Sequence, residues 1–194
     1  MPAKMNEIIQ ICQHHQIKII EDAAEALGSE YQGQKCGALG DFGVLSFNGN
    51  KIITTSGGGA LVCKTAEDKQ KAVFLATQAR DSAPHYEHTQ LGYNFRMSNI
   101  LAGIGRGQMQ ALDERVAQKR QINAQYRQIL PSYAFQDESV DGRSNYWLTA
   151  IITQSYEQRE AIRLALEQDN IESRPLWNPM HLQPLYQHST HYLN

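Results

Sequence analysis

Apolar residues near the start of the chain recur at the spacing of one helix face. The positions i, i+3, i+4 and i+7 are filled by Met5, Ile8, Ile9 and Cys12. Polar residues separate them, so an amphipathic helix is expected here. Residues 17–21 follow as a short apolar run, which predicts a buried strand. A helix leading into a strand is half of a βαβ unit, so the pattern indicates an α/β architecture. The strand that would precede the helix in such a unit is not found in these residues.

Further along, the apolar pattern changes to that of strands and then back to that of a helix. Residues 42–47 and 60–63 have the length and composition of two strands. Thr65 is placed to cap a helix that runs to about Gln78. Residues 80–94 are polar and irregular. This stretch is long for a structureless loop, which favours a functional or partner-contacting segment.

A very long helical pattern begins at Ser98, which is a suitable N-cap, and extends to about Leu130. Three glycines occupy alternate positions over residues 103–107. Each costs about 1 kcal/mol relative to alanine inside a helix, so either the helix breaks there or another element packs very closely. Pro131 marks the expected end of the helix.

After Pro131 the pattern changes to that of a small α/β lobe. Its expected elements are a strand over 146–153, a helix over 156–168 and a short strand over 171–174. Residues 175–194 form no obvious element. The predicted domains are therefore residues 1–131 and residues 132–194.

Composition excludes several classes of protein. The 194 residues are 41% hydrophobic and 20% charged, and the formal net charge of -2 gives no basic field for nucleic acid or anionic membranes. No apolar run approaches the length of a bilayer span and no apolar signal core is present at the start, so a cytoplasmic protein is expected. The three cysteines lack a CxxC pair and the histidines lack an HExxH frame, so neither a disulfide framework nor a metal site is expected.

Two of the predicted strands end beside residues that could act together. The strand over 17–21 leads into Asp22, and the strand over 42–47 leads to Lys51 in a glycine-containing turn. Ligands of open α/β sheets bind outside the carboxyl ends of the strands. A lysine and an aspartate at that edge could hold pyridoxal phosphate, the lysine as Schiff base and the aspartate against the ring nitrogen. Ser46 could offer a hydroxyl to the phosphate, and Glu25 lies where it could face the same ligand.

Each of these residues also has an ordinary interpretation. A strand-end aspartate such as Asp22 is commonly a helix cap or a turn former. Lys51 in a Gly-Asn turn, and Ser46 near it, could simply be solvated. On spacing alone both interpretations stay open.

Several longer segments resemble those of a known protein family. They are residues 21–28 (EDAAEALG), 40–51 (GDFGVLSFNGNK), 57–60 (GGGA), 92–98 (GYNFRMS), 172–177 (ESRPLW) and 179–181 (PMH). In this order they resemble the DegT/DnrJ/EryC1/StrS family of pyridoxal-phosphate-dependent nucleotide-sugar aminotransferases. The resemblance implies an α/β fold of the aspartate-aminotransferase type (fold type I). It also implies that this chain holds part of the large domain and most of the small C-terminal lobe.

The resemblance implies a role for each matching residue. Lys51 matches the Schiff-base lysine, Asp22 the partner of the pyridinium nitrogen, Ser46 a phosphate ligand and Glu25 a cofactor contact. Asn94 matches an asparagine that reaches the cofactor phosphate of a neighbouring subunit, which implies a homodimer with a shared active site. Without the family, a turn former would be the preferred interpretation of that asparagine.

Arg174 and His181 match a segment near the entrance for the nucleotide sugar. Arginine suits a diphosphate, although an arginine before proline is as often a surface ion-pair partner. The lysine at position 51, where related dehydratases carry histidine, favours transamination. The implied reaction moves an amino group from an amino acid, with glutamate as the expected donor, to a UDP-linked 4-keto-6-deoxy sugar in cell-surface polysaccharide or glycan synthesis.

The chain also departs from the family pattern. The N-terminal half-domain and the last C-terminal elements of the family have no counterpart in these residues, so part of a family member is expected. The alternative function is a catalytically inactive remnant that retains a dimerisation or binding surface. A generic α/β small-molecule binder is a third possibility.

Overall fold

The computed structural model describes residues 1–192, which form two compact units. The first unit contains Met1–Ile129 and Asp137–Thr149, and the second contains Leu130–Gln136 and the chain from Ala150 onward. Residues 137–149 thus group with the first unit although they follow Pro131. The two units are described separately below.

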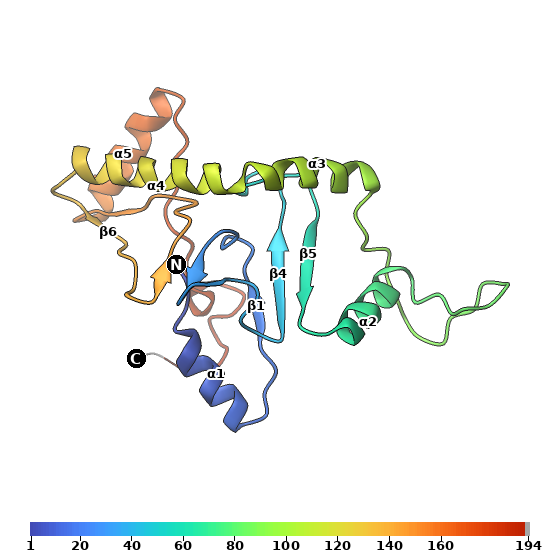
Figure 1. Ribbon diagram of the computed structural model, residues 1–194. Helices are drawn as coiled ribbons and strands as arrows, with labels where there is room; N and C mark the ends of the chain where they lie inside the picture. Colours follow the sequence, from blue (N-terminus) through green and yellow to red (C-terminus); the bar gives the residue numbers. More distant parts are fainter. Residues whose placement is uncertain (193–194) are drawn as a thin grey trace. The chain divides into compact units, whose positions relative to one another are not determined.

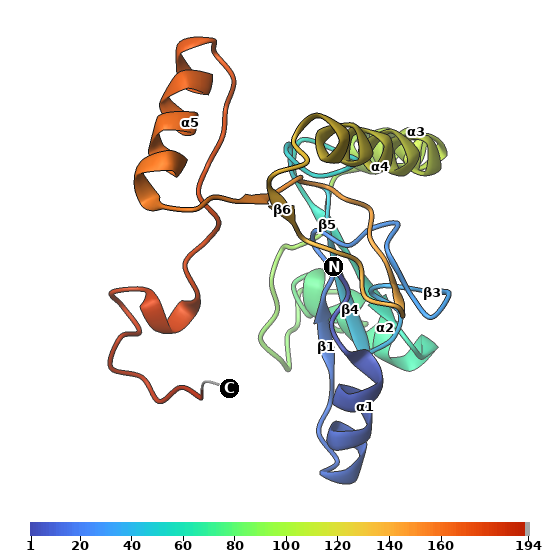
Figure 2. The ribbon, with the colours of Figure 1, turned by 90° about the vertical axis from the view of Figure 1, so that its left-hand side faces the viewer.

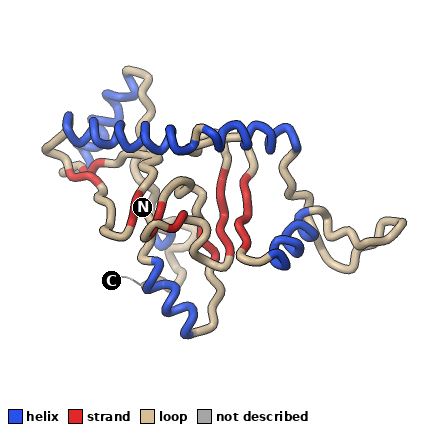
Figure 3. The backbone as a smooth tube through the Cα atoms, in the orientation of Figure 1, coloured by secondary structure: helices blue, strands red, loops and turns tan. Residues whose placement is uncertain are grey.

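A three-stranded sheet organises the first unit (Figures 1 and 3). Its strand order is β1 (Ile20–Asp22), β4 (Phe42–Ser46) and β5 (Gly59–Cys63), with β1 parallel and β5 antiparallel to β4. The strand predicted over 17–21 therefore lies one to three residues later than expected. Because β1 and β4 are parallel, their carboxyl ends meet at one edge of the sheet.

Helices precede and follow this sheet, and local capping determines where two of them begin. They are α1 (Met5–His14), α2 (Ala66–Ala76), α3 (Asn99–Gln110) and α4 (Leu112–Ile129). Thr65 accepts a hydrogen bond from the backbone N–H of Asp68, and Ser98 accepts one from that of Leu101, as predicted for both N-caps. α3 and α4 follow one another across one end of β4 and β5 (Figure 1), and Figure 2 views both helices nearly end-on.

The long helix predicted from Ser98 is interrupted at Ala111, not at the glycines. A side chain added at Gly103 or Gly107 would meet nothing within 4 Å, and one at Gly105 would lie 3.1 Å from the Thr55 Cγ2 atom. Close packing therefore explains one of the three glycines.

Two apolar clusters form the core of the first unit. One consists of Met5, Tyr31 and Leu39. The other consists of Ile53, Leu112 and Val116, with Leu27, Phe47 and Ile52 packed against it. This second cluster anchors the chain on both sides of the turn that carries Lys51.

Gly28 lies against the second cluster at φ +84°, and an added Cβ there would lie 2.6 Å from the Val116 Cγ2 atom. Only glycine satisfies both the backbone angle and the space.

A small antiparallel sheet joins distant parts of the same unit. Its order is β3 (Gln34–Lys35), β2 (Glu30–Tyr31) and β7 (Gly142–Arg143). β7 belongs to residues 137–149, which continue toward Asn145 and Trp147. The pairing therefore brings this late segment back beside the first strands of the chain.

The second unit contains one strand pair and one long helix. β6 (Ala134–Phe135) pairs with β8 (Ile151–Ile152), and α5 (Tyr156–Gln168) and the short 3₁₀ turn η1 (Met180–Leu182) follow. The predicted helix over 156–168 is confirmed.

Two strand predictions in this part of the chain are wrong. Of residues 146–153, only Ile151 and Ile152 are in a strand, because Tyr146 has φ +45° and cannot continue an extended backbone. Residues 171–174 contain no strand; the N–H of Ile171 bonds back to the carbonyl of Leu166 at the end of α5. The prediction over 175–194 extends past residue 192 and is tested only up to it.

Among residues 1–192, no helix has both the length and the apolar character needed to cross a bilayer.

Candidate active site

The edge formed by the carboxyl ends of β1 and β4 carries two of the predicted cofactor residues. Asp22 is the last residue of β1 and Ser46 the last of β4. Asp22 is aligned with Val44, so Ser46 lies two residues farther along on the same face of the sheet. The Asp22 carboxylate is exposed and accepts one hydrogen bond, from the N–H of Ala24 at 3.2 Å.

Lys51 lies beyond the same edge, in the turn after β4. Its N–H bonds to the carbonyl of Asn48 at 3.0 Å. The Lys51 ammonium pairs with the Glu25 carboxylate, and its Nζ atom lies 4.8 Å from the centre of the Trp147 ring. The lysine side chain is only 12% exposed. The amine is therefore enclosed by a carboxylate and an aromatic ring.

The Glu25 loop is fastened to the same late segment. The side-chain amide of Asn145 donates to the carbonyls of Glu25, at 2.8 Å, and Leu27, at 3.0 Å. The sequence pattern does not predict Asn145 and Trp147 at this site, because it places Trp147 in a strand over 146–153 and Asn145 just before that strand. No local signal identifies them, since their partners are about 100 residues earlier in the chain.

Glu21 has a structural role that the sequence pattern does not reveal. Its carboxylate accepts hydrogen bonds from the backbone N–H groups of Gly37 at 2.8 Å, Leu39 at 2.5 Å and Gly40 at 2.6 Å. Three donors on one carboxylate hold the 37–40 loop against β1. Asp22 follows directly, so this loop supports the residue that begins the candidate site.

The structure does not bring Asn94 to this edge. Asn94 forms an isolated bridge with Thr77 just after α2. Within residues 1–192 it forms no hydrogen bond or ion pair with Lys51 or Asp22. A role for Asn94 at its own chain's site is therefore not supported by this geometry.

Arg174 and His181 belong to the second unit. Arg174 pairs with the Glu172 carboxylate. The His181 ring stacks on that of His191 with centroids 4.9 Å apart. Arg174 is exposed, whereas His181 is partly buried.

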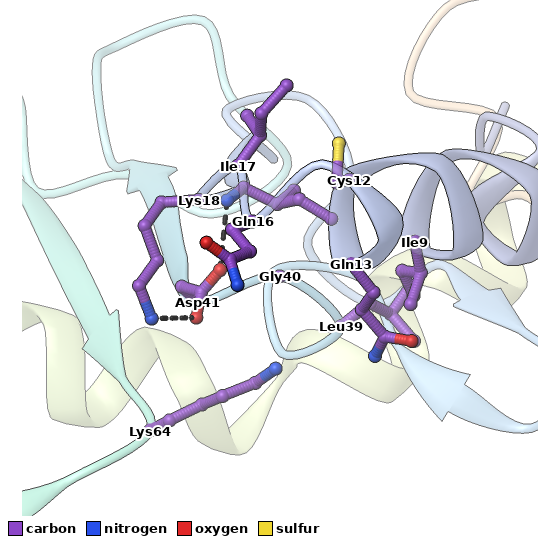
Figure 4. A pocket seen from close by; sticks show the side chains of 11 residues that line it. Ile9, Cys12, Gln13, Gln16, Ile17, Lys18, Leu39, Gly40, Asp41 and Lys64 are labelled. Atoms are coloured by element: carbon purple, nitrogen blue, oxygen red, sulfur yellow. Dashed lines mark hydrogen bonds and ion pairs between the residues drawn. The ribbon is translucent and has the colours of Figure 1, made fainter.

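A second lysine–carboxylate pair lies at the amino ends of the same strands, beside a hollow of about 280 Å³ (Figure 4). Lys18 Nζ is 3.0 Å from Asp41 Oδ1, and the Ile19 N–H donates to the other Asp41 oxygen at 2.9 Å. The backbone hydrogen bond from Ile19, followed by the bond from Lys18, lowers the pKa of Asp41 below its ordinary value. The hydrogen bond to Asp41 raises the pKa of Lys18. Lys64 also lines this hollow.

The residues at the carboxyl edge fit pyridoxal phosphate chemically. A lysine amine can bond to its aldehyde, a carboxylate can hold the proton on its ring nitrogen, and a hydroxyl can donate to its phosphate. Lys51, Asp22 and Ser46 supply these three groups at one end of two neighbouring strands. In contrast, no cluster of three or more His, Cys, Asp or Glu residues in the described part of the chain is arranged to hold a metal ion.

Comparison with known proteins places this arrangement in a family. The chain matches the DegT/DnrJ/EryC1/StrS aminotransferase family over residues 1–194. EpsN of Bacillus subtilis, named provisionally as a pyridoxal phosphate-dependent aminotransferase, is 48% identical over 95% of this chain and 48% of its own length. GDP-perosamine synthase of Escherichia coli O157:H7 is 36% identical over 95% of this chain and 51% of its own.

The crystal structure of the aminotransferase TlmJ from Streptoalloteichus hindustanus superposes with a TM-score of 0.88 at 28% identity, covering 95% of this chain and 51% of TlmJ. The predicted fold class, part of a fold type I aminotransferase, is confirmed by this likeness. The chain spans about half the length of the relatives that it matches. On these grounds it belongs to the DegT/DnrJ/EryC1/StrS aminotransferase family.

Proposed function

We propose that this chain carries the catalytic lysine of a pyridoxal-phosphate-dependent aminotransferase acting on a nucleotide-linked keto sugar. The observation that carries the proposal is the enclosed Lys51 amine beyond the carboxyl ends of β1 and β4, next to Glu25 and on the same edge as Asp22. When bound, pyridoxal phosphate supplies the electron sink that lets an amino group move between two substrates.

The residues of this chain would divide the remaining work. Lys51 would hold the cofactor through its aldehyde carbon, with loss of water, and once a substrate amine had displaced it the free lysine amine would carry the proton between carbon atoms. Asp22, with one carboxylate oxygen turned to the Ala24 N–H, would keep the ring nitrogen protonated by its negative charge. The Ser46 hydroxyl would donate to the phosphate. Glu25, which pairs with Lys51 in the cofactor-free chain, would contact the cofactor.

A nucleotide sugar is the proposed acceptor, with glutamate as the donor, in the synthesis of a cell-surface polysaccharide or glycan. The name of the GDP-perosamine synthase supports a nucleotide-sugar acceptor and brings in a guanosine nucleotide beside the uridine nucleotide expected from the sequence. Arg174 and His181 are the proposed contacts at the sugar entrance. The exposed guanidinium of Arg174 suits a diphosphate, and the partly buried His181 ring lies in the same segment.

We further propose a homodimer with a shared active site. Asn94 lies beside Thr77 and away from Lys51 of its own chain, which is what a residue serving a neighbouring subunit requires. Large apolar residues near it are exposed, namely Leu91, Tyr93, Phe95, Ile100 and Ile104. An interface would cover them.

The test uses the chain with added pyridoxal phosphate. After sodium borohydride reduction, peptide mass spectrometry is expected to find the cofactor on Lys51 at close to one per chain. Transfer of label from ¹⁵N-glutamate is then measured with UDP-linked and GDP-linked 4-keto-6-deoxy sugars. A folded chain that carries no cofactor on Lys51 would refute the proposal for this polypeptide. A defined oligomer by light scattering in that case would identify the inactive, binding-only alternative.

A further inference from the structure

Residues 144–147 join the two loops of the candidate active site. Asn145 is 3% exposed, and its backbone N–H donates to Ser29 Oγ at 2.9 Å. Its side-chain amide donates to the carbonyls of Glu25 and Leu27. Asn145 is thus fixed to the loop that carries Glu25 by three hydrogen bonds.

Trp147 reaches the other loop. Its backbone N–H donates to Asn145 Oδ1 at 3.0 Å, which orients the residue. Its indole Nε1–H donates to the carbonyl of Asn50 at 2.7 Å, and Lys51 Nζ lies 4.8 Å from its ring centre. One side chain therefore binds the backbone of the lysine turn and the lysine ammonium.

The start of the segment is held independently. Glu138 accepts from the Ser144 N–H at 2.5 Å, and Arg120 donates to the Ser144 carbonyl at 2.5 Å. Arg120 also pairs with Glu138. The position of Trp147 is consequently set by the first unit itself and does not depend on Lys51.

We propose that Trp147 is a positioning residue for Lys51, holding the ammonium against Glu25 through its ring face and the Asn48–Lys51 turn through its indole N–H. The ring attracts the cation by its quadrupole, and it also excludes water from the amine. Held in this way, Lys51 keeps one orientation in the turn after β4, at the strand edge where Asp22 ends β1. The inference rests on the proposed function for the meaning of this orientation, but the contacts themselves are testable without the cofactor.

The experiment measures the accessibility of Lys51 in the cofactor-free chain. Lysines are acylated with a small neutral reagent and each site is followed by mass spectrometry, with Lys18 as internal reference. In Trp147→Leu the rate at Lys51 is expected to rise about 5-fold, which is the factor that a single cation–π contact can account for. In Trp147→Phe, which retains a ring, it is expected to stay close to that of the unmodified chain.

Backbone hydrogen exchange over residues 48–51 separates the second contact. Both variants lose the indole N–H, so exchange in this turn is expected to become faster in both. Tyr156→Leu is the matched control, because it removes a ring that covers the Arg159 cation in the second unit. It should change neither measurement.

The proposal is overturned if folded Trp147→Leu keeps the original acylation rate at Lys51. If that variant does not fold, unchanged exchange over 48–51 in Trp147→Phe overturns it instead. Failure of the original chain to attach pyridoxal phosphate to Lys51 would contradict only the proposed function. The two ideas can therefore fail separately.

Discussion

Two lysine–carboxylate pairs lie at opposite ends of β1 and β4, and they differ in what surrounds the lysine. At the amino ends, Lys18 pairs with Asp41 and its side chain is 79% exposed. At the carboxyl ends, Lys51 pairs with Glu25 and its side chain is 12% exposed. The charged groups are of the same kind in both places, so charge pairing alone does not decide how exposed the lysine is.

The difference comes from a part of the chain distant in sequence. Around Lys18 and Asp41 the structure has an open hollow (Figure 4), and the lysine extends along its rim. Around Lys51 it has the Trp147 ring, held there by Asn145. An exposed ion pair contributes little to the free energy of folding because water competes for both partners. The shielded amine of Lys51, in contrast, is held in one place by its neighbours.

The largest expected effect comes from removing each lysine in turn. Lys51→Ala should abolish covalent attachment of pyridoxal phosphate, because it removes the shielded amine in the turn after β4, at the edge that carries Asp22. Lys18→Ala should leave attachment unchanged. Absorbance of the protein fraction after gel filtration with the cofactor measures both. Equal losses in the two variants would contradict the assignment of the carboxyl edge as the active end.

The next effect concerns the hydrogen bonds from Asn145 that hold the Glu25 loop. Asn145→Ala leaves the partly buried carbonyls of Glu25 and Leu27 without the amide that donates to them, so the free energy of unfolding should fall by about 2–3 kcal/mol. Urea denaturation followed by circular dichroism measures this change. Asn6→Ala, which removes one exposed hydrogen bond to Gln32, is the control and should change it by less than about 0.5 kcal/mol. Similar losses in both variants would mean that the hydrogen bonds of Asn145 do not stabilise the Glu25 loop.

A smaller effect depends on pH. The hydrogen bond from Arg120 lowers the pKa of Glu138, opposed by desolvation and helped by the Ser144 N–H. A carboxylate whose pKa is lowered in the folded state stabilises the fold above its unfolded value, which is near 4.5, and loses that contribution as pH falls through the lower folded value.

The free energies of unfolding of the original chain and Glu138→Gln should therefore differ by roughly 1 kcal/mol at pH 7 and converge as the pH falls through the lowered pKa of Glu138. Urea titrations at several pH values measure the difference. A gap that is constant from pH 7 to pH 3 would show that the charge of Glu138 does not hold the 144–147 segment.

The smallest effect is expected at the amino ends. Lys18→Ala should shift the urea midpoint less than Glu138→Gln does, because Asp41 keeps its bond from the Ile19 N–H and the lysine is already in water. Added salt should reduce even this shift. A loss as large as that of Asn145→Ala would remove the contrast between the two ends.

Much of this protein is determined by short-range sequence features. Thr65, Ser98 and Ser155 begin their helices by accepting bonds from N–H groups three residues later, so each cap is visible in a few letters. The carboxyl ends of two strands bring Asp22 and Ser46 to one edge once the strands are parallel. The family follows from longer runs such as residues 40–51.

Only the tertiary structure decided what encloses Lys51. Trp147 is about 100 residues later than Lys51, in a stretch whose pattern predicts a strand, and Asn145 just before it holds the Glu25 loop. The helix after Ser98 likewise breaks at Ala111 and not at its glycines. Local hydrogen bonds and apolar periodicity act over a few residues, and sequence patterns record them. Contacts across 100 residues depend on how separate segments pack, which no local pattern contains.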